Sequence, residues 1–102
     1  MNYKIGKLLL LVDTKWTGLE VTLYIGNNIY LDSFALPIKG VFAMNENELG
    51  NLLYKRMNSR VYNMFSEGEK SVYSELIAEK MIMNCKENKD ATAQINNFAI
   101  FA

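Results

Sequence analysis

The stretch LLLLVDTKWTGLEVTLYIGNNIYLDSFALP, residues 8–37, decides the fold of this chain. It contains three segments rich in strand-forming residues, separated by residues that favour turns. Residues 7–12 are almost entirely apolar, which predicts a first strand buried on both faces. The polar residues 13–18 that follow predict a turn.

Residues 19–25 alternate between apolar and polar side chains, a pattern typical of a strand with one buried face. Gly26 and the two asparagines after it predict a hairpin connection, because these residues accept positive φ at low cost. Residues 29–36 are then the returning strand, and Pro37 ends it. The first third of the chain therefore predicts an antiparallel meander.

After residue 44 the period of the apolar residues changes from two to about 3.6. Asn45 is a good helix N-cap, and an apolar stripe at spacings of three and four extends from Leu49 to Phe65. Ser66 and Glu69 have the spacing of a capping box, which predicts a second helix ending near Lys86. Its inward positions are Val72, Tyr73, Leu76, Ile77, Met81 and Cys85.

These segments predict a single α+β domain over residues 1–102, with a three- or four-stranded, mostly antiparallel sheet and two helices on one face. The order is β-β-β-α-α, with the tail 95–102 as a possible final strand. That tail carries Phe98 and Phe101, so the alternative is a segment that binds a partner.

Composition removes several kinds of chemistry. The 102 residues include no histidine and one cysteine, and the formal net charge is zero. A histidine base, a histidine metal ligand and an internal disulfide are therefore impossible, and we expect no metal site and no cofactor. No apolar run approaches the roughly 20 residues that a membrane span needs. We expect a cytoplasmic protein that does not enter a membrane.

Asp13 has two interpretations. An aspartate at the end of a strand commonly opens a turn by accepting a hydrogen bond from the backbone two residues on, and we favour this role. Residues 8–25 also resemble the opening hairpin of the actin-like and sugar-kinase ATPase superfamily. There, a hydrophobic strand ends in Asp-Thr, here Asp13 and Thr14, and a glycine, here Gly18, leads into an alternating strand.

The resemblance to these ATPases implies that Asp13 lies near nucleotide phosphates and a metal ion. It covers less than a third of the chain. Lys15 and Trp16 stand where the approach of a phosphate favours small residues. A related alternative is a ribonuclease-H-like site, in which Asp13, Glu20 and Asp32 would hold metal ions.

The run Lys55–Arg60 is the most basic part of the predicted helices. It places Arg56 and Arg60 one helical turn apart, where they could contact phosphates or acidic side chains. A nucleic-acid binder working through these two arginines is therefore an alternative function, although the neutral net charge opposes it. The simpler interpretation is a solvated helix face.

Aromatic residues exceed what a core of this size needs, and several fall outside the predicted inward faces. Exposed Tyr, Trp and Arg side chains commonly anchor protein interfaces. We therefore expect a small non-enzymatic protein that binds and blocks a protein partner, as do phage or mobile-element inhibitors of bacterial defence such as anti-CRISPR proteins. A homodimer through the tail strand or the exposed helix face is an open alternative. The predicted contact residues are Trp16, Tyr24, Tyr54, Arg56, Arg60, Tyr62, Phe98 and Phe101.

Overall fold

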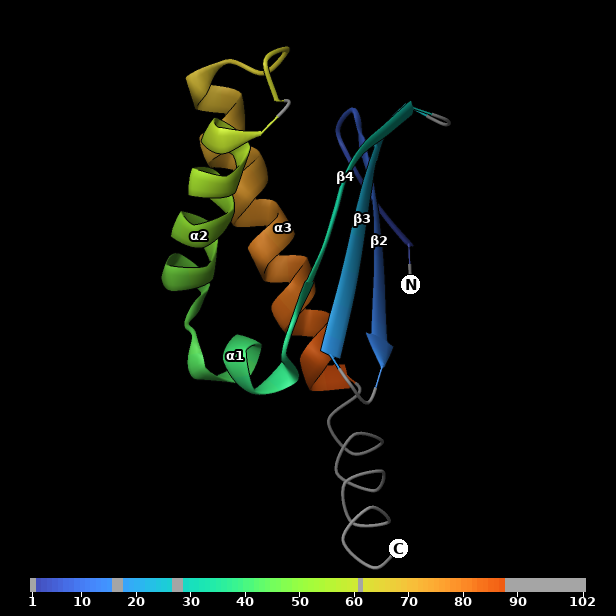
Figure 1. The fold of residues 1–102 in the computed structure, drawn as a ribbon, viewed down its shortest axis with the longest axis vertical. Helices are drawn as coiled ribbons and strands as arrows, with labels where there is room; N and C mark the ends of the chain where they lie inside the picture. The colour runs from blue at the N-terminus through green and yellow to red at the C-terminus, as the bar shows by residue number, and fades with distance from the viewer. Residues whose placement is uncertain (1, 16–17, 27–28, 61, 88–102) are drawn as a thin grey trace, which may run out of the picture.

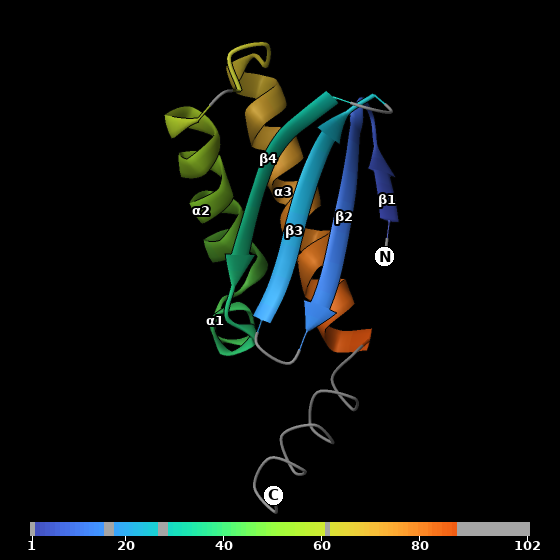
Figure 2. The same ribbon diagram turned by 45° about the vertical axis from the view of Figure 1, so that its right-hand side comes forward.

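A computed structural model describes residues 2–15, 18–26, 29–60 and 62–87. Four antiparallel strands form one sheet in the order β1-β2-β3-β4, and helices α1, α2 and α3 pack together on one face of it (Figures 1 and 2). The predicted α+β class and the two long helices on one face are confirmed. The strands are β1 (Asn2–Ile5), β2 (Leu8–Lys15), β3 (Gly18–Ile25) and β4 (Ile29–Leu36). The helices are α1 (Ile38–Ala43), α2 (Glu46–Ser59) and α3 (Glu67–Glu87).

The fourth strand lies at the N-terminal end of the chain, where the sequence pattern predicted none. β1 pairs with β2 in the register Asn2 to Leu11 and Ile5 to Leu8. Gly6 makes the turn between these strands with φ +55°, a conformation that suits glycine. The predicted C-terminal strand, residues 95–102, lies outside the described residues.

β2 corrects two predictions. Its side chains alternate, with Leu8, Leu10 and Val12 buried and Leu9 and Leu11 half-buried, so the strand is buried on one face and not on both. It also continues through the predicted turn, because Asp13 pairs with Glu20 and Lys15 pairs with Gly18. Asp13 is therefore a strand residue, and the turn assigned to it is wrong.

A bulge in β4 changes which face its side chains point to. Leu23 lies opposite Asp32, and Tyr24 lies opposite Tyr30, so Leu31 is the extra residue between them. Simple alternation would place Asp32 on the same face as Tyr30. The bulge instead turns Asp32 toward the helices, where it is 8% exposed, while Tyr30 points to the other face.

α2 begins where the sequence predicted. Asn45 caps it by accepting a hydrogen bond from the Glu48 backbone N–H at 2.8 Å. The helix ends at Ser59, and Arg60 is already extended, so the predicted continuation to Phe65 is wrong. Tyr62 and Phe65 still enter the core, but from the connection to α3. The short helix α1, which starts directly after Pro37, was not predicted.

α3 starts with the predicted capping box. The Glu69 N–H donates to Ser66 Oγ at 3.2 Å, and the Ser66 N–H donates to Glu69 Oε1 at 3.0 Å. Cys85 is buried as predicted, and burial raises the pKa of its thiol. Val72 was expected to face inward but is 55% exposed.

The core lies between the sheet and the helices. From the sheet it takes Leu8, Leu10, Val12, Leu19, Val21 and Leu23, and from α2 and α3 it takes Leu49, Leu53, Met57, Ile77, Ala78 and Met81. Among the helices that the structure describes, none is both long and apolar enough to cross a membrane.

Candidate functional site

The sheet has one open face. The helices cover the other face, and none of the described elements lies over this one (Figure 1). Strand alternation and the bulge determine its composition, because paired residues of antiparallel strands point to the same side. The open face carries Lys4, Leu9, Leu11, Asp13, Lys15, Glu20, Thr22, Tyr24, Tyr30 and Ser33.

Apolar and aromatic side chains gather at one end of the open face. Leu9 pairs with Tyr24, and Tyr24 pairs with Tyr30, so the three form one row across β2, β3 and β4. The two tyrosine rings meet edge to face with centroids 6.1 Å apart. Tyr30 is 60% exposed. Leu11 continues the apolar surface into the next row. We call Leu9, Leu11, Tyr24 and Tyr30 the tyrosine patch.

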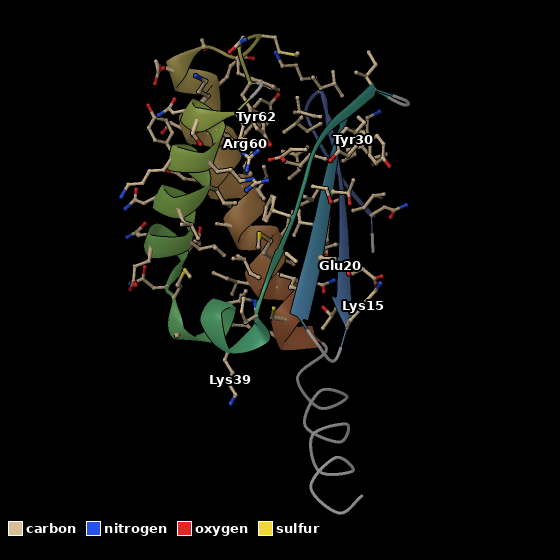
Figure 3. The ribbon with its side chains drawn as sticks, viewed as in Figure 1. Lys15, Glu20, Tyr30, Lys39, Arg60 and Tyr62 are labelled. Atoms are coloured by element: carbon tan, nitrogen blue, oxygen red, sulfur yellow. The ribbon has the colours of Figure 1, made fainter. Side chains whose placement is uncertain are left out.

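The other end of the open face is charged. Asp13 and Glu20 lie directly opposite each other, an arrangement that is unfavourable for two carboxylates. The Lys15 ammonium compensates by contacting Glu20 Oε2 at 3.1 Å (Figure 3). The hydrogen bond from Lys15 to Glu20 raises the pKa of the lysine. This end of the face therefore carries both signs of charge on exposed side chains.

The three carboxylates of the ribonuclease-H-like hypothesis do not meet. Asp13 and Glu20 share the open face, whereas Asp32 points to the helices. Within the described part of the chain, no three Asp, Glu, Cys or His side chains are grouped closely enough to hold a metal ion. That hypothesis is therefore wrong for these residues. Asp13 also lies within the paired part of β2, not in a loop that could fold around phosphates.

Asp32 holds β4 against α2. Arg56 binds it with two hydrogen bonds, from Nε to Oδ2 at 2.7 Å and from Nη2 to Oδ1 at 2.8 Å. The Tyr62 hydroxyl donates to Oδ2 at 3.0 Å, and the Ser33 backbone N–H donates to Oδ1 at 2.9 Å. Arg56 also donates to the Ser33 carbonyl at 3.1 Å. We call Asp32, Arg56 and Tyr62 the carboxylate clamp.

The electrostatics of the clamp follow from its geometry. Burial opposes the charge on Asp32, but the hydrogen bonds from Arg56 and Tyr62 outweigh burial and lower the pKa of this carboxyl. Burial and the neighbouring Asp32 charge raise the pKa of Tyr62, so the phenol keeps its proton. The Arg56 guanidinium also lies 4.8 Å from the centre of the Phe34 ring. The clamp is thus a structural contact in which the charges of Asp32 and Arg56 compensate each other.

The predicted contact residues have different surroundings. Tyr62 is 1% exposed, so its side chain offers no surface to a partner in this structure. Arg60 is exposed and caps the C-terminal end of α2, where the backbone is already extended. Tyr54 is half-buried and donates a hydrogen bond to Glu67 Oε2, which links α2 to the start of α3. Trp16, Phe98 and Phe101 lie outside the described residues.

Of the predicted set, the tyrosine patch contains Tyr24 alone. Leu9 and Leu11 were not predicted as contact residues, because five consecutive apolar residues in the sequence conceal the alternation of β2. Tyr30 was not among the predicted contact residues, although the register of the hairpin places it directly opposite Tyr24. No known family, curated protein or solved structure matches this chain.

Proposed function

We propose that this chain is a non-enzymatic protein-binding module whose open sheet face contacts the partner. The observation that carries the proposal is the tyrosine patch, a continuous apolar row that no described element covers. Contiguous exposed apolar surface on a small domain is typical of interaction sites, because its burial against a partner is favourable.

The composition of the open face suits a protein partner. Tyrosine supplies a large contact area together with a hydroxyl that can remain hydrogen-bonded, and it is enriched where interfaces have their strongest contacts. Lys4 lies beside Leu9, and Asp13, Lys15 and Glu20 lie at the other end of the open face, so charges of both signs share this face with the patch. A complementary partner has an apolar centre and a polar rim of mixed charge.

The nucleic-acid alternative loses part of its basis in the structure. The Arg56 charge is engaged by Asp32, so the pair of free arginines on which the alternative depended is reduced to Arg60. That this chain blocks a bacterial defence protein stays a prediction, which rests on the type of sequence alone. Such a role requires the open sheet face to cover the surface through which the partner acts.

The test uses two charge substitutions at similarly exposed apolar positions. Tyr30→Asp places a carboxylate in the tyrosine patch, whereas Met64→Asp alters the connection between α2 and α3, where Met64 is 56% exposed. Affinity capture from host lysate with a 0.5 M salt wash should retain one protein on the wild type and on Met64→Asp. Tyr30→Asp should lose it while keeping its melting temperature. Loss with both variants, or with neither, would contradict the proposal.

A further inference from the structure

β4 forms one edge of the sheet, on the side next to α2 (Figure 2). The backbone N–H and C=O groups that point outward from an edge strand can pair with a strand of another chain. β4 is eight residues long, so it carries several such groups. The way in which these groups are satisfied therefore decides whether the sheets of two chains can join.

The hydrogen-bond pattern of the sheet directs the backbone of Ser33 outward. The Gly26 N–H donates to the Lys7 carbonyl, so the backbone of Gly26 faces β2. Residues of an antiparallel strand face their two neighbouring strands alternately, so Thr22, four residues before Gly26, also faces β2. Thr22 is the partner of Ser33 in β4. This pair therefore lacks backbone hydrogen bonds, and the N–H and C=O of Ser33 point away from β3.

The carboxylate clamp binds both outward groups of Ser33. The Ser33 N–H donates to Asp32 Oδ1 at 2.9 Å, and the Ser33 carbonyl accepts from Arg56 Nη2 at 3.1 Å. The same guanidinium is held by its two hydrogen bonds to Asp32. A strand that approached β4 at Ser33 would have to displace both side chains before it formed backbone hydrogen bonds of its own.

An apolar hollow lies beside the Arg56 guanidinium, between β4 and α2. Its volume is about 160 Å³, and it is lined by Phe34, Ala35, Leu36, Leu52, Leu53 and Arg56. The guanidinium lies 4.8 Å from the centre of the Phe34 ring, and Leu52 is 42% exposed. Side chains of an added strand would find apolar contacts here. Without the clamp, the edge of β4 would therefore favour pairing.

We propose that Asp32 and Arg56 protect the edge of β4 from pairing with β4 of a second copy of this chain. A second copy is the relevant partner because two identical edges can pair antiparallel about a two-fold axis. Edge strands of natural proteins are commonly protected by a bulge and by a charged residue that points inward. β4 has both, since the bulge at Leu31 turns Asp32 toward the helices. This inference does not depend on the proposed binding function of the open face.

Amide hydrogen exchange of the wild type, followed by NMR, is the first test. Ser33 and Ala35 are both exposed, and their amides face the same edge because they lie two residues apart in β4. Within the described residues, no side chain binds the Ala35 N–H. Relative to an unfolded peptide, we expect Ser33 to exchange about tenfold more slowly than Ala35, because a hydrogen bond must open first. Equal protection of the two amides would overturn the proposal.

The second test removes the clamp without leaving a charge uncompensated. The clamp-free variant combines Asp32→Leu, Arg56→Met and Tyr62→Phe, so that no buried charge or hydroxyl loses its partner. Ile77→Val is the control, because it lowers stability from the core side of α3 and leaves β4 unchanged. In sedimentation velocity, we expect the clamp-free variant to associate more strongly than the wild type, and Ile77→Val to behave as the wild type does.

Nuclear Overhauser contacts in a mixture of isotope-labelled and unlabelled chains identify the paired edge. Contacts between chains around Ser33 of the clamp-free variant support the proposal. A folded clamp-free variant that associates no more than the wild type, or that associates through another surface, would contradict it. Equal association of Ile77→Val would also contradict it, because lost stability would then explain the effect. If the clamp-free variant does not fold, the exchange rates of Ser33 and Ala35 in the wild type decide.

Discussion

Asp32 shows how one carboxylate can join elements that are distant in the sequence. Its four hydrogen bonds come from α2, from the connection before α3 and from its own strand. A buried ionic contact contributes little when compared with apolar residues, but removing one partner is costly because the other keeps an uncompensated charge. The clamp should therefore be sensitive to single substitutions.

We predict that Asp32→Asn lowers the free energy of unfolding by about 2 kcal/mol. The neutral amide leaves the half-buried Arg56 guanidinium without its counter-charge. Urea denaturation followed by far-UV circular dichroism measures the change. The matched control is Asp13→Asn, an exposed aspartate on the open face, which should change stability by less than about 0.5 kcal/mol. Equal effects of the two substitutions would show that the clamp does not stabilise the fold.

The pKa shift of Asp32 also predicts a dependence of stability on pH. Its pKa is lower in the folded protein than in the unfolded chain, where it is about 3.9. The stabilisation is therefore complete above that value and is lost as the pH falls through the folded pKa. Denaturation of the wild type and Asp32→Asn from pH 7 down to pH 2 should show the difference between them shrinking below pH 4. A constant difference would contradict the assignment.

At the scale of secondary-structure elements, the helix starts were predicted from local sequence signals. Features that depend on contacts between distant residues were missed. The Asn45 cap and the Ser66–Glu69 capping box involve residues three apart, so the sequence shows them directly. The end of α2 at Ser59 was not predicted. The apolar stripe continues to Phe65, but these last residues reach the core from a loop.

The strands show the same limit. β1 is four residues long and is held in the sheet by its pairing with β2. A segment this short shows no strand pattern of its own in the sequence. The bulge at Leu31 places Asp32 on the opposite face from Tyr30, whereas regular alternation would put both on one face. The candidate site was predicted only in part. Tyr24 was among the predicted contact residues, whereas Leu9 and Leu11 were hidden in an unbroken apolar run.

Substitution of glycine by alanine should have opposite effects at two positions, one in a helix and one in a strand. A Cβ on Gly50 of α2 would lie 3.9 Å from Glu75 Cα, an ordinary contact, whereas a Cβ on Gly18 of β3 would lie 2.9 Å from the Leu36 carbonyl oxygen. Gly50→Ala should therefore raise the free energy of unfolding by about 1 kcal/mol through helix propensity. Gly18→Ala should lower the free energy of unfolding by about 1 kcal/mol or more, because the backbone of β3 or of Leu36 must move to make room for the methyl group.

Thermal and urea denaturation of the two glycine variants measure these changes. Stabilisation by Gly18→Ala would mean that β3 and the end of β4 are not as close as described. Destabilisation by Gly50→Ala would mean that α2 and α3 approach each other more closely at Gly50 than the 3.9 Å contact allows. The pair thus checks the packing of both layers with one methyl group each.

At the scale of the whole molecule, the fold has two layers and places its apolar surface unevenly. The helices cover one face of the sheet, while no described element covers the other face, where Tyr30 is exposed and Leu9, Leu11 and Tyr24 are half-buried. Small domains commonly leave some apolar residues exposed, but a continuous row across three strands is a surface available to a partner. This asymmetry is the basis of the proposed binding function.

The most direct test of the binding proposal is site-specific photo-crosslinking in host cells. A photoreactive phenylalanine analogue replaces Tyr30 in one sample and Met64 in another, and mass spectrometry identifies the cross-linked proteins. We predict that position 30 captures one dominant protein and that position 64 does not capture it. Capture of the same protein from position 64 alone would place the interface elsewhere and contradict the assignment of the open sheet face.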